Sequence, residues 1–384
     1  MEVKFDAALR VPGEIFVGAD ALSDAMPAIT RCGRKALVVT GPHVGRSVMM
    51  QRLCELLEEA RVEYVTFDGI TGEPTDQMIA TGVRVYRDAA CDFCIGIGGG
   101  SPLDSAKAIA AMTVCEGEIA DYNGRVIDCD MPRVVAIPTT AGTGSEVTKF
   151  TIVTDTRRGI KMLLKGDVLL PDVAVVDYTL GTTAPPSVTA ATGLDALTHA
   201  VESLLSQRAT PATDELAVSA VKRIMKYLPV AYRNGDNAEA REQLAIAAME
   251  AGVCINNSSV TVVHGMSRPI GALFHVPHGI SNAILLADCL ADMEDAAGDK
   301  YTLLARAIGV PDDGFVAAVK ELCRVCEVPS LQELGIDKEA FEAAIPKMSA
   351  DAIASGSPAN APKPYTMADC QKLYIQLGVS SVRS

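Results

Sequence analysis

The 384-residue chain has no apolar run long enough to span a bilayer. Its N-terminal stretch, "MEVKFDAALRVPGEIF", also lacks the basic segment, apolar run and small-residue cleavage site of a secretory leader. From these two absences we expect neither an integral membrane protein nor a secreted protein with a leader. We therefore expect a cytoplasmic protein that has no membrane partner.

The sequence also has no long block of basic residues. Its formal net charge is −14, with 34 Lys and Arg against 48 Asp and Glu. Binding to a phosphate backbone requires a concentrated basic face, so the charge pattern argues against a nucleic-acid partner. Any anionic ligand must be held by local groups.

The eleven cysteines form no dense framework. Their number is odd and they are scattered along a long chain, which predicts reduced thiols. Two pairs, Cys91 with Cys94 and Cys323 with Cys326, have the CxxC spacing of a zinc or redox site. The first pair lies in an apolar strand-like run and the second in a helical pattern, so we interpret both as packing cysteines.

Two kinds of segment divide the chain. The first half alternates helical segments with the strand-like runs "KALVVT", "VEYVTFDG", "DFCIGIGGG" and "RVVAIPTT", which predicts a mostly parallel α/β sheet. Long helical patterns follow, including one whose apolar face contains Ala217, Val221, Ile224 and Leu228. We predict an α/β dinucleotide-binding domain over residues 1–182 and an all-α, metal-binding domain over residues 183–384.

Glycine is concentrated where the strand "IGIGGG" meets the helical segment "SPLDSAKAIA". Ser101 is predicted as the N-cap of that helix, Pro102 as its first residue, and Asp104 as the partner of Ser101 in a capping box. A tight glycine turn at a helix N-terminus can bind a diphosphate. The turn lacks the GxGxxG fingerprint, so a purely structural turn stays open. A second Gly/Thr loop, "PTTAGTGSEVT", follows the next strand and favours a nucleotide site, since ligands of open α/β sheets collect at strand C-termini.

Histidine is scarce, with five in the whole chain, yet three of them lie in "HGMSRPIGALFHVPHG". Asp195 and His199 are four residues apart in a helical pattern, which places both on one helix face. With His264 and His278 they make one carboxylate and three imidazoles, a set that suits Fe2+, Zn2+ or a similar divalent metal. The alternative for each residue is ordinary surface polarity or a hydrogen-bonded core histidine.

These segments, together with "LPDVAVVD" and "ATGLDALTHAVES", resemble in order and spacing the signatures of the iron-containing (group III) alcohol dehydrogenases. The resemblance spans roughly residues 5 to 380. It implies NAD or NADP as cofactor, Fe2+ as metal, and a metal site made of Asp195, His199, His264 and His278. The cofactor contacts that it implies are Gly98, Gly99, Ser101, Asp104, Thr139, Thr140, Thr143, Thr148 and Lys161.

Two positions depart from the family pattern. Many members have a histidine, suggested as a proton relay, four residues after the third metal ligand, where this chain has Arg268. Proton transfer is then expected to use His275 or water. Many NAD-specific members have an acidic residue after the strand "KALVVT", where this chain has Gly41, so NADP(H) is not excluded.

The expected function is hydride transfer between NAD(P)H and a small aldehyde or primary alcohol. Arg268 suggests a substrate with a sulfonate, phosphonate or carboxylate group, because a guanidinium binds an oxyanion through two parallel hydrogen bonds. The alternatives are a simple short-chain alcohol or diol dehydrogenase, and a metal- and NAD-dependent lyase similar to dehydroquinate synthase. We expect a homodimer or higher homo-oligomer.

Overall fold

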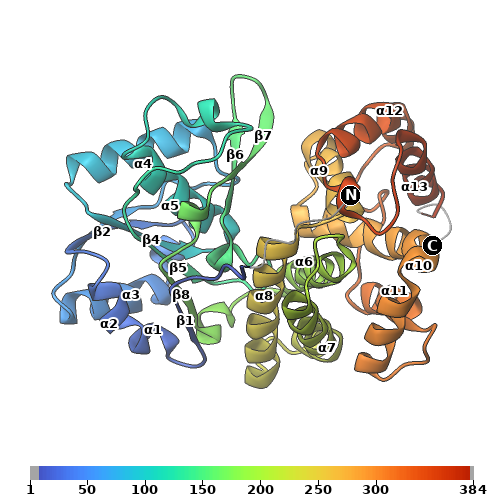
Figure 1. The fold of residues 1–384 in the computed structure, drawn as a ribbon. Coiled ribbons are helices and arrows are strands. Elements are labelled where there is room, and N and C mark those ends of the chain that lie inside the picture. Colours follow the sequence, from blue (N-terminus) through green and yellow to red (C-terminus); the bar gives the residue numbers. More distant parts are fainter. Residues whose placement is uncertain (1–7, 381–384) are drawn as a thin grey trace. The chain divides into compact units, whose positions relative to one another are not determined.

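The strand-like runs of the first half of the chain form one parallel sheet. In the computed structural model, which describes residues 8–380, six strands pair in the order β1-β8-β5-β4-β2-β3, and every pairing in this sheet is parallel (Figure 1). The strands are β1 (Glu14–Val17), β2 (Lys35–Val39), β3 (Glu63–Phe67), β4 (Phe93–Gly98), β5 (Val134–Pro138) and β8 (Val173–Val176).

Helices cover both faces of this sheet, because side chains of a strand point alternately to opposite faces. Ala36 and Val38 of β2 pack into one apolar cluster with α1, α2 and α3, while Leu37 and Val39 pack into a second cluster with α4 and α5. The helices are α1 (Ala21–Asp24), α2 (Met26–Thr30), α3 (Val48–Glu59), α4 (Asp76–Asp88) and α5 (Gly100–Met112). The result is a three-layer α/β unit.

The strand order reverses between β2 and β4. From β2 the chain crosses to its neighbour β3 and then returns to β4 on the other side of β2. Open α/β sheets bind ligands outside the carboxyl ends of the strands at such a switch point. The glycine turn after β4 lies at this position, and the Gly/Thr loop follows the adjacent strand β5.

A separate two-stranded hairpin, which the sequence analysis did not predict, belongs to the same unit. It consists of the antiparallel strands β6 (Phe150–Asp155) and β7 (Ile160–Lys165). The short 3-10 helices of the described chain are η1 (Val44–Arg46), η2 (Ile119–Tyr122), η3 (Ser145–Val147), η4 (Asp167–Leu169), η5 (Tyr178–Gly181) and η6 (Pro358–Asn360).

The rest of the described chain is helical. Its helices are α6 (Pro186–Leu205), α7 (Pro211–Arg233), α8 (Ala238–Ser258), α9 (Val262–Phe274), α10 (His278–Ile308), α11 (Phe315–Val325), α12 (Lys338–Ala354) and α13 (Met367–Ser380). Thr210 caps α7 through a capping box, and all four residues of its predicted apolar face are buried. Non-helical dihedral angles at Ala297 kink α10.

The predicted fold class is confirmed: a parallel α/β unit precedes an all-α unit. By its contacts the chain passes from the first unit, which begins at Arg10, to the second between Thr183 and Ala184. Among the described residues no single helix is long and apolar enough to cross a membrane. Helices α8 and α9, which are bent by 103° relative to each other, are together long and apolar enough to cross one, by length and composition only.

The prediction that every cysteine is a reduced thiol is wrong. Cys115 and Cys129 form a disulfide, with their Cα atoms 6.1 Å apart. No local pattern predicts this pair, because the fold brings together two cysteines 14 residues apart that share no motif. The packing interpretation of the CxxC pairs is confirmed for Cys91, Cys94 and Cys326, which are free and buried, while Cys323 is partly buried.

Candidate metal and nucleotide sites

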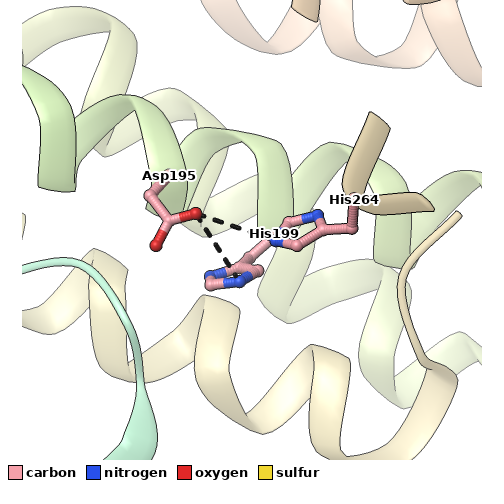
Figure 2. A group of neighbouring side chains, drawn as sticks. All are labelled: Asp195, His199 and His264. Carbon is pink, nitrogen blue, oxygen red and sulfur yellow. Dashed lines mark ion pairs between the residues drawn. The ribbon is translucent and has the colours of Figure 1, made fainter. Parts of the chain in front are cut away.

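Helix α6 carries the first two predicted metal ligands. Asp195 and His199 are one turn apart and both buried, and Asp195 Oδ1 lies 3.9 Å from His199 Nε2 (Figure 2). Pro186 suits the first turn, and the many apolar residues that follow bury this helix in the all-α unit. The i, i+4 spacing therefore directs both side chains to one place, as the sequence predicted.

The other two predicted ligands come from later helices of the same unit. His264, buried on α9, lies with Nε2 3.7 Å from Asp195 Oδ1, and its ring stacks on His199 with centroids 4.7 Å apart. His278, the first residue of α10, also has Nε2 3.7 Å from Asp195 Oδ1. The potential ligand atoms of Asp195, His199 and His264 all lie within 4.8 Å of one another. The structure thus brings all four residues together.

Asn282 shows where these donor atoms converge. It lies one turn after His278, and its Nδ2 donates to Asp195 Oδ1 at 2.7 Å. The same atom lies 3.2 Å from His264 Nε2 and 3.3 Å from His278 Nε2. Three lone pairs thus point at one buried amide donor. A carboxylate oxygen and imidazole nitrogens directed at one point fit a borderline divalent cation such as Fe2+ or Zn2+.

The electrostatics keep the carboxylate in its ligand form. Burial raises the pKa of Asp195, but His199, His278 and His264 lower it far below the usual range of an aspartate. Burial lowers the pKa of His264, but Glu202 and Asp195 raise it above the ordinary value. Asp195 is therefore ionised at neutral pH and presents a negative charge to the convergence point.

Glu202 is a buried residue next to this site that the sequence analysis missed. One carboxylate oxygen accepts from Thr261 Oγ1 at 2.6 Å and from the Val263 N–H at 2.7 Å, and the other lies 2.6 Å from His264 Nδ1. Burial raises its pKa, but His264 and Thr261 lower it below the ordinary value. A signal existed, because Glu202 follows His199 by three residues on the same helix face.

Arg268, the predicted substrate residue, and His275, the predicted proton-transfer residue, have different surroundings. Arg268, one turn after His264 on α9, is partly buried, and its Nη1 donates to Ser357 Oγ at 3.1 Å. Arg268 has no ion-pair partner among residues 8–380, and burial lowers its pKa although Glu202 raises it. His275 is exposed and takes a left-handed conformation, φ 56°, where α9 ends. The contacts that unite the four predicted ligands do not include His275.

The glycine turn of the α/β unit requires glycine at Gly98. Its φ is +145°, and a Cβ there would lie 2.7 Å from Pro102 Cγ. At Gly99 a Cβ would reach nothing closer than Thr140 Oγ1 at 3.6 Å, so the backbone is open to a ligand. The Thr139 N–H donates to the Gly98 carbonyl at 2.8 Å, which joins the turn to the second loop.

The predicted cap of this helix is wrong. Helix α5 begins at Gly100 with Gly99 as its N-cap, and no side chain caps it within the described chain. The turn at Gly98 starts the helix two residues early, which places Ser101 inside it. The carboxylate of Asp104 instead accepts from Ser145 Oγ and from the Ile152 N–H, so it joins α5 to η3 and β6. The uncapped N–H groups of α5 suit an anion.

The predicted cofactor contacts therefore divide into two groups. Gly98, Gly99, Thr139 and Thr140 lie together at the turn, and a Cβ at Gly100 would lie 2.9 Å from Thr143 Cγ2. The remaining predicted contacts do not line the turn itself. Thr148 is buried and accepts from Lys107 through its hydroxyl and carbonyl, and Lys161, an exposed residue of β7, pairs with Glu73 at 2.5 Å. Ser101 is partly buried in the first turn of α5.

Comparison with known proteins decides the family. Residues 12–178 match the model named iron-containing alcohol dehydrogenase, and residues 189–377 match its C-terminal counterpart. The chain is 33% identical, over 344 residues, to the NAD-dependent methanol dehydrogenase of Bacillus methanolicus, covering 86% of this chain and 90% of that protein. The chain belongs to the iron-containing alcohol dehydrogenase family.

Two solved structures extend the comparison. A 1,3-propanediol oxidoreductase superposes with a TM-score of 0.94 at 32% identity, covering 98% of this chain and 100% of that one. A sulfoacetaldehyde reductase from Bifidobacterium kashiwanohense, solved with NAD+, superposes with a TM-score of 0.89 at 28% identity, covering 98% and 99% of the two chains. The predicted family and the enzyme class, a metal- and nicotinamide-dependent alcohol dehydrogenase, are confirmed.

Gly41, which follows β2 and departs from the family pattern, has a steric reason to be glycine in this structure. A Cβ there would lie 2.9 Å from the carbonyl oxygen of Ile70. An acidic residue at this position would require the backbone to shift. Cofactor preference is therefore better measured on the unmutated enzyme than on a Gly41→Asp variant.

Proposed function

We propose that this member of the family transfers hydride between a nicotinamide nucleotide and a small aldehyde or primary alcohol, with a metal ion held by Asp195, His199, His264 and His278. The observation that carries the proposal is the convergence of one carboxylate and two imidazoles on Asn282 Nδ2, with the third imidazole, that of His199, 3.9 Å from the same carboxylate oxygen. In such a site the metal supplies Lewis acidity toward the carbonyl oxygen, and the nicotinamide supplies the hydride.

The residues of the chain then have distinct roles. Asp195 contributes negative charge to the metal site, and the buried histidines exclude water from it. The turn at Gly98–Gly99 and the uncapped start of α5 would hold the diphosphate of NAD(P). Proton exchange would use His275 or water. His275 is exposed, which suits exchange with solvent.

The metal assignment is tested with His278→Ala. His278 is half-exposed at the start of α10, so its removal should leave a folded protein. We expect the variant to lose bound metal and nearly all turnover, as measured by elemental analysis of anaerobically purified protein and by NAD(P)H oxidation. A folded variant with native metal content and rate would overturn the assignment.

The substrate is the finer part of the proposal. We infer an aldehyde or alcohol with an anionic group bound by Arg268, because a partly buried guanidinium without an ion pair in the described chain has donors to offer. The structural similarity to a sulfoacetaldehyde reductase supports this inference. A neutral short alcohol or diol is the second candidate, supported by the names methanol dehydrogenase and 1,3-propanediol oxidoreductase.

The two candidates are separated with short aldehydes that differ only in a terminal methyl, carboxylate, sulfonate or phosphonate. Loss of a charge-assisted hydrogen bond of roughly 1.5 to 3 kcal/mol should lower kcat/KM of Arg268→Met about 10- to 100-fold for the charged aldehydes alone. Arg306→Met, which removes an exposed arginine paired with Asp312, is the control. The anionic class fails if neutral aldehydes have the highest kcat/KM, or if Arg268→Met affects both classes equally.

The same assay tests the lyase alternative. A dehydrogenase consumes NAD(P)H in proportion to the aldehyde added, whereas a lyase shows no net redox change. Running it with NADH and NADPH in parallel measures the preference left open at Gly41. Homo-oligomeric assembly and a cytoplasmic location stay predictions, and light scattering tests the first.

A further inference from the structure

Glu202 lies behind the metal site rather than in it. It is fully buried on α6, and its carboxylate faces α9 through Thr261, Val263 and His264. Nothing in the proposed hydride transfer requires a second buried carboxylate. Burial of a charge is costly unless hydrogen bonds compensate it, so three short contacts to one segment call for an explanation.

The donors around Glu202 fix the direction of each hydrogen bond. The Val263 N–H can only donate, so the atom that faces it must be an acceptor. A carboxylate offers acceptors on both oxygens, so at the 2.6 Å contact the His264 Nδ1 must carry the proton. In neutral imidazole the other nitrogen, Nε2, then has the lone pair.

A second contact, independent of Glu202, requires the same tautomer. Asn282 Nδ2, a donor, lies 3.2 Å from His264 Nε2, so that nitrogen must accept. Asp195 Oδ1 lies 3.7 Å from the same nitrogen. The lone pair of His264 therefore points to the place where the ligand atoms converge.

We propose that Glu202 is a positioning residue that holds the proton of His264 on Nδ1 and thereby keeps Nε2 available as a metal ligand. The inference rests on the metal site of the proposed function. Partners of this kind orient a ligand histidine and raise its basicity, and their loss typically costs about 10- to 100-fold in metal affinity.

Glu202→Gln is the sharpest perturbation because the surroundings dictate how the amide must lie. The Val263 N–H takes the amide oxygen, so the amide NH2 faces His264 and donates to Nδ1. The ring proton then moves to Nε2, where it blocks metal binding. The substitution keeps the size of the side chain and reverses one hydrogen bond.

The tautomer is read by 15N NMR of the histidine rings in metal-free protein in alkaline buffer, where imidazole is neutral. The His264 signal is assigned by its absence in His264→Gln. We expect an Nδ1–H tautomer in the unmutated protein and an Nε2–H tautomer in Glu202→Gln. Zn2+ affinity, measured by chelator competition, should fall about 10- to 100-fold in that variant.

Glu250→Gln is the matched control. Glu250 is a buried carboxylate of α8 that accepts from Ser219 Oγ, so its neutralisation should change neither the tautomer nor the Zn2+ affinity. An Nε2–H tautomer in the unmutated protein overturns the inference without any variant. Nδ1–H retained in folded Glu202→Gln, or unchanged Zn2+ affinity, also overturns it. If the tautomer switches but the unmutated protein binds no divalent metal, the proposed function fails and the hold of Glu202 on His264 stands.

Discussion

Lys107 is fully buried beneath the glycine turn and offers a quantitative test of how the nucleotide loops are held. Its Nζ donates to Ser145 Oγ at 3.0 Å, to Thr148 Oγ1 at 3.2 Å, and to the carbonyl oxygens of Thr148 and Phe150, each at 2.9 Å. The carboxylate of Asp104 lies 3.7 Å away. One ammonium thus joins α5 to the loop that leads into β6.

Replacing Lys107 with Met removes the charge and every one of these donors. Burial lowers the pKa of Lys107 and raises that of Asp104, while each charge opposes the shift of the other. Removing one partner of a buried pair leaves the other uncompensated, at a cost of about 3 to 5 kcal/mol. In the double variant Asp104→Asn, Lys107→Met the buried carboxylate of Asp104 is no longer left unpaired, and about 1 to 3 kcal/mol should be regained as coupling between the two sites.

The assay is urea unfolding of the single and double variants, with Lys165→Met, an exposed lysine of β7, as the control expected within about 0.5 kcal/mol of the unmutated protein. Hydrogen exchange of residues 139–152 should accelerate in Lys107→Met. Metal content should not change, because the metal residues belong to the other unit. A loss below about 1 kcal/mol, or additive effects in the double variant, would refute this account of the loop.

Three further predictions follow from single contacts. Burial raises the pKa of Glu146 from 4.5 to about 7, so the folded protein loses stability as pH rises through this range and the buried carboxyl ionises. Glu146→Gln should therefore raise the free energy of unfolding by roughly 3 kcal/mol above this range and change it little below, as measured by urea unfolding across pH. Asn282→Leu removes the amide that donates to the converging acceptors, so the metal-free variant should lose about 1 to 3 kcal/mol of unfolding free energy. Added Zn2+ should remove the difference in Tm between the variant and the unmutated protein. An equal difference in Tm with Zn2+ would contradict this account. Gly98→Ala should lower the free energy of unfolding by about 1 to 3 kcal/mol because of the positive φ at this position. Gly99→Ala should keep native stability and weaken NADH binding. A larger loss of stability in Gly99→Ala than in Gly98→Ala would contradict this account of the turn.

Local sequence periodicity predicted most of the sheet and the first two metal ligands. Apolar strands between helical patterns predict a parallel sheet, and β2, β3, β4 and β5 begin and end within two residues of the predicted runs, whereas β1 and β8 were not predicted. Asp195 and His199 could be paired from spacing alone, because four residues on a helix return to one face. His264 and His278 lie on other helices, so no spacing rule joined them to the pair; the concentration of histidine in one segment suggested them and the resemblance supported them.

What the sequence analysis missed is tertiary. The capping-box spacing predicts Ser101 as the local partner of Asp104, but the carboxylate contacts residues 41 and 48 positions later, which no local rule predicts. Glu202 contacts His264 across 62 residues for the same reason. The hairpin of β6 and β7 buries alternate residues, but apolar and polar residues do not alternate in its sequence, so its burial pattern is visible only in the fold.

The buried Lys107 and the partly buried Arg268 show how a structural charge differs from a functional one. Lys107 meets four acceptors and a carboxylate, so its burial is compensated and its removal should destabilise the unit around it. Arg268 meets one hydroxyl and, within the described residues, no ion-pair partner, so its burial is poorly compensated. Stability alone would favour an uncharged side chain at Arg268, and an anionic ligand would supply the missing partner. Arg268→Met should therefore match or exceed the stability of the unmutated protein while Lys107→Met falls below it, and a large loss of stability in Arg268→Met would mean that the guanidinium serves the fold.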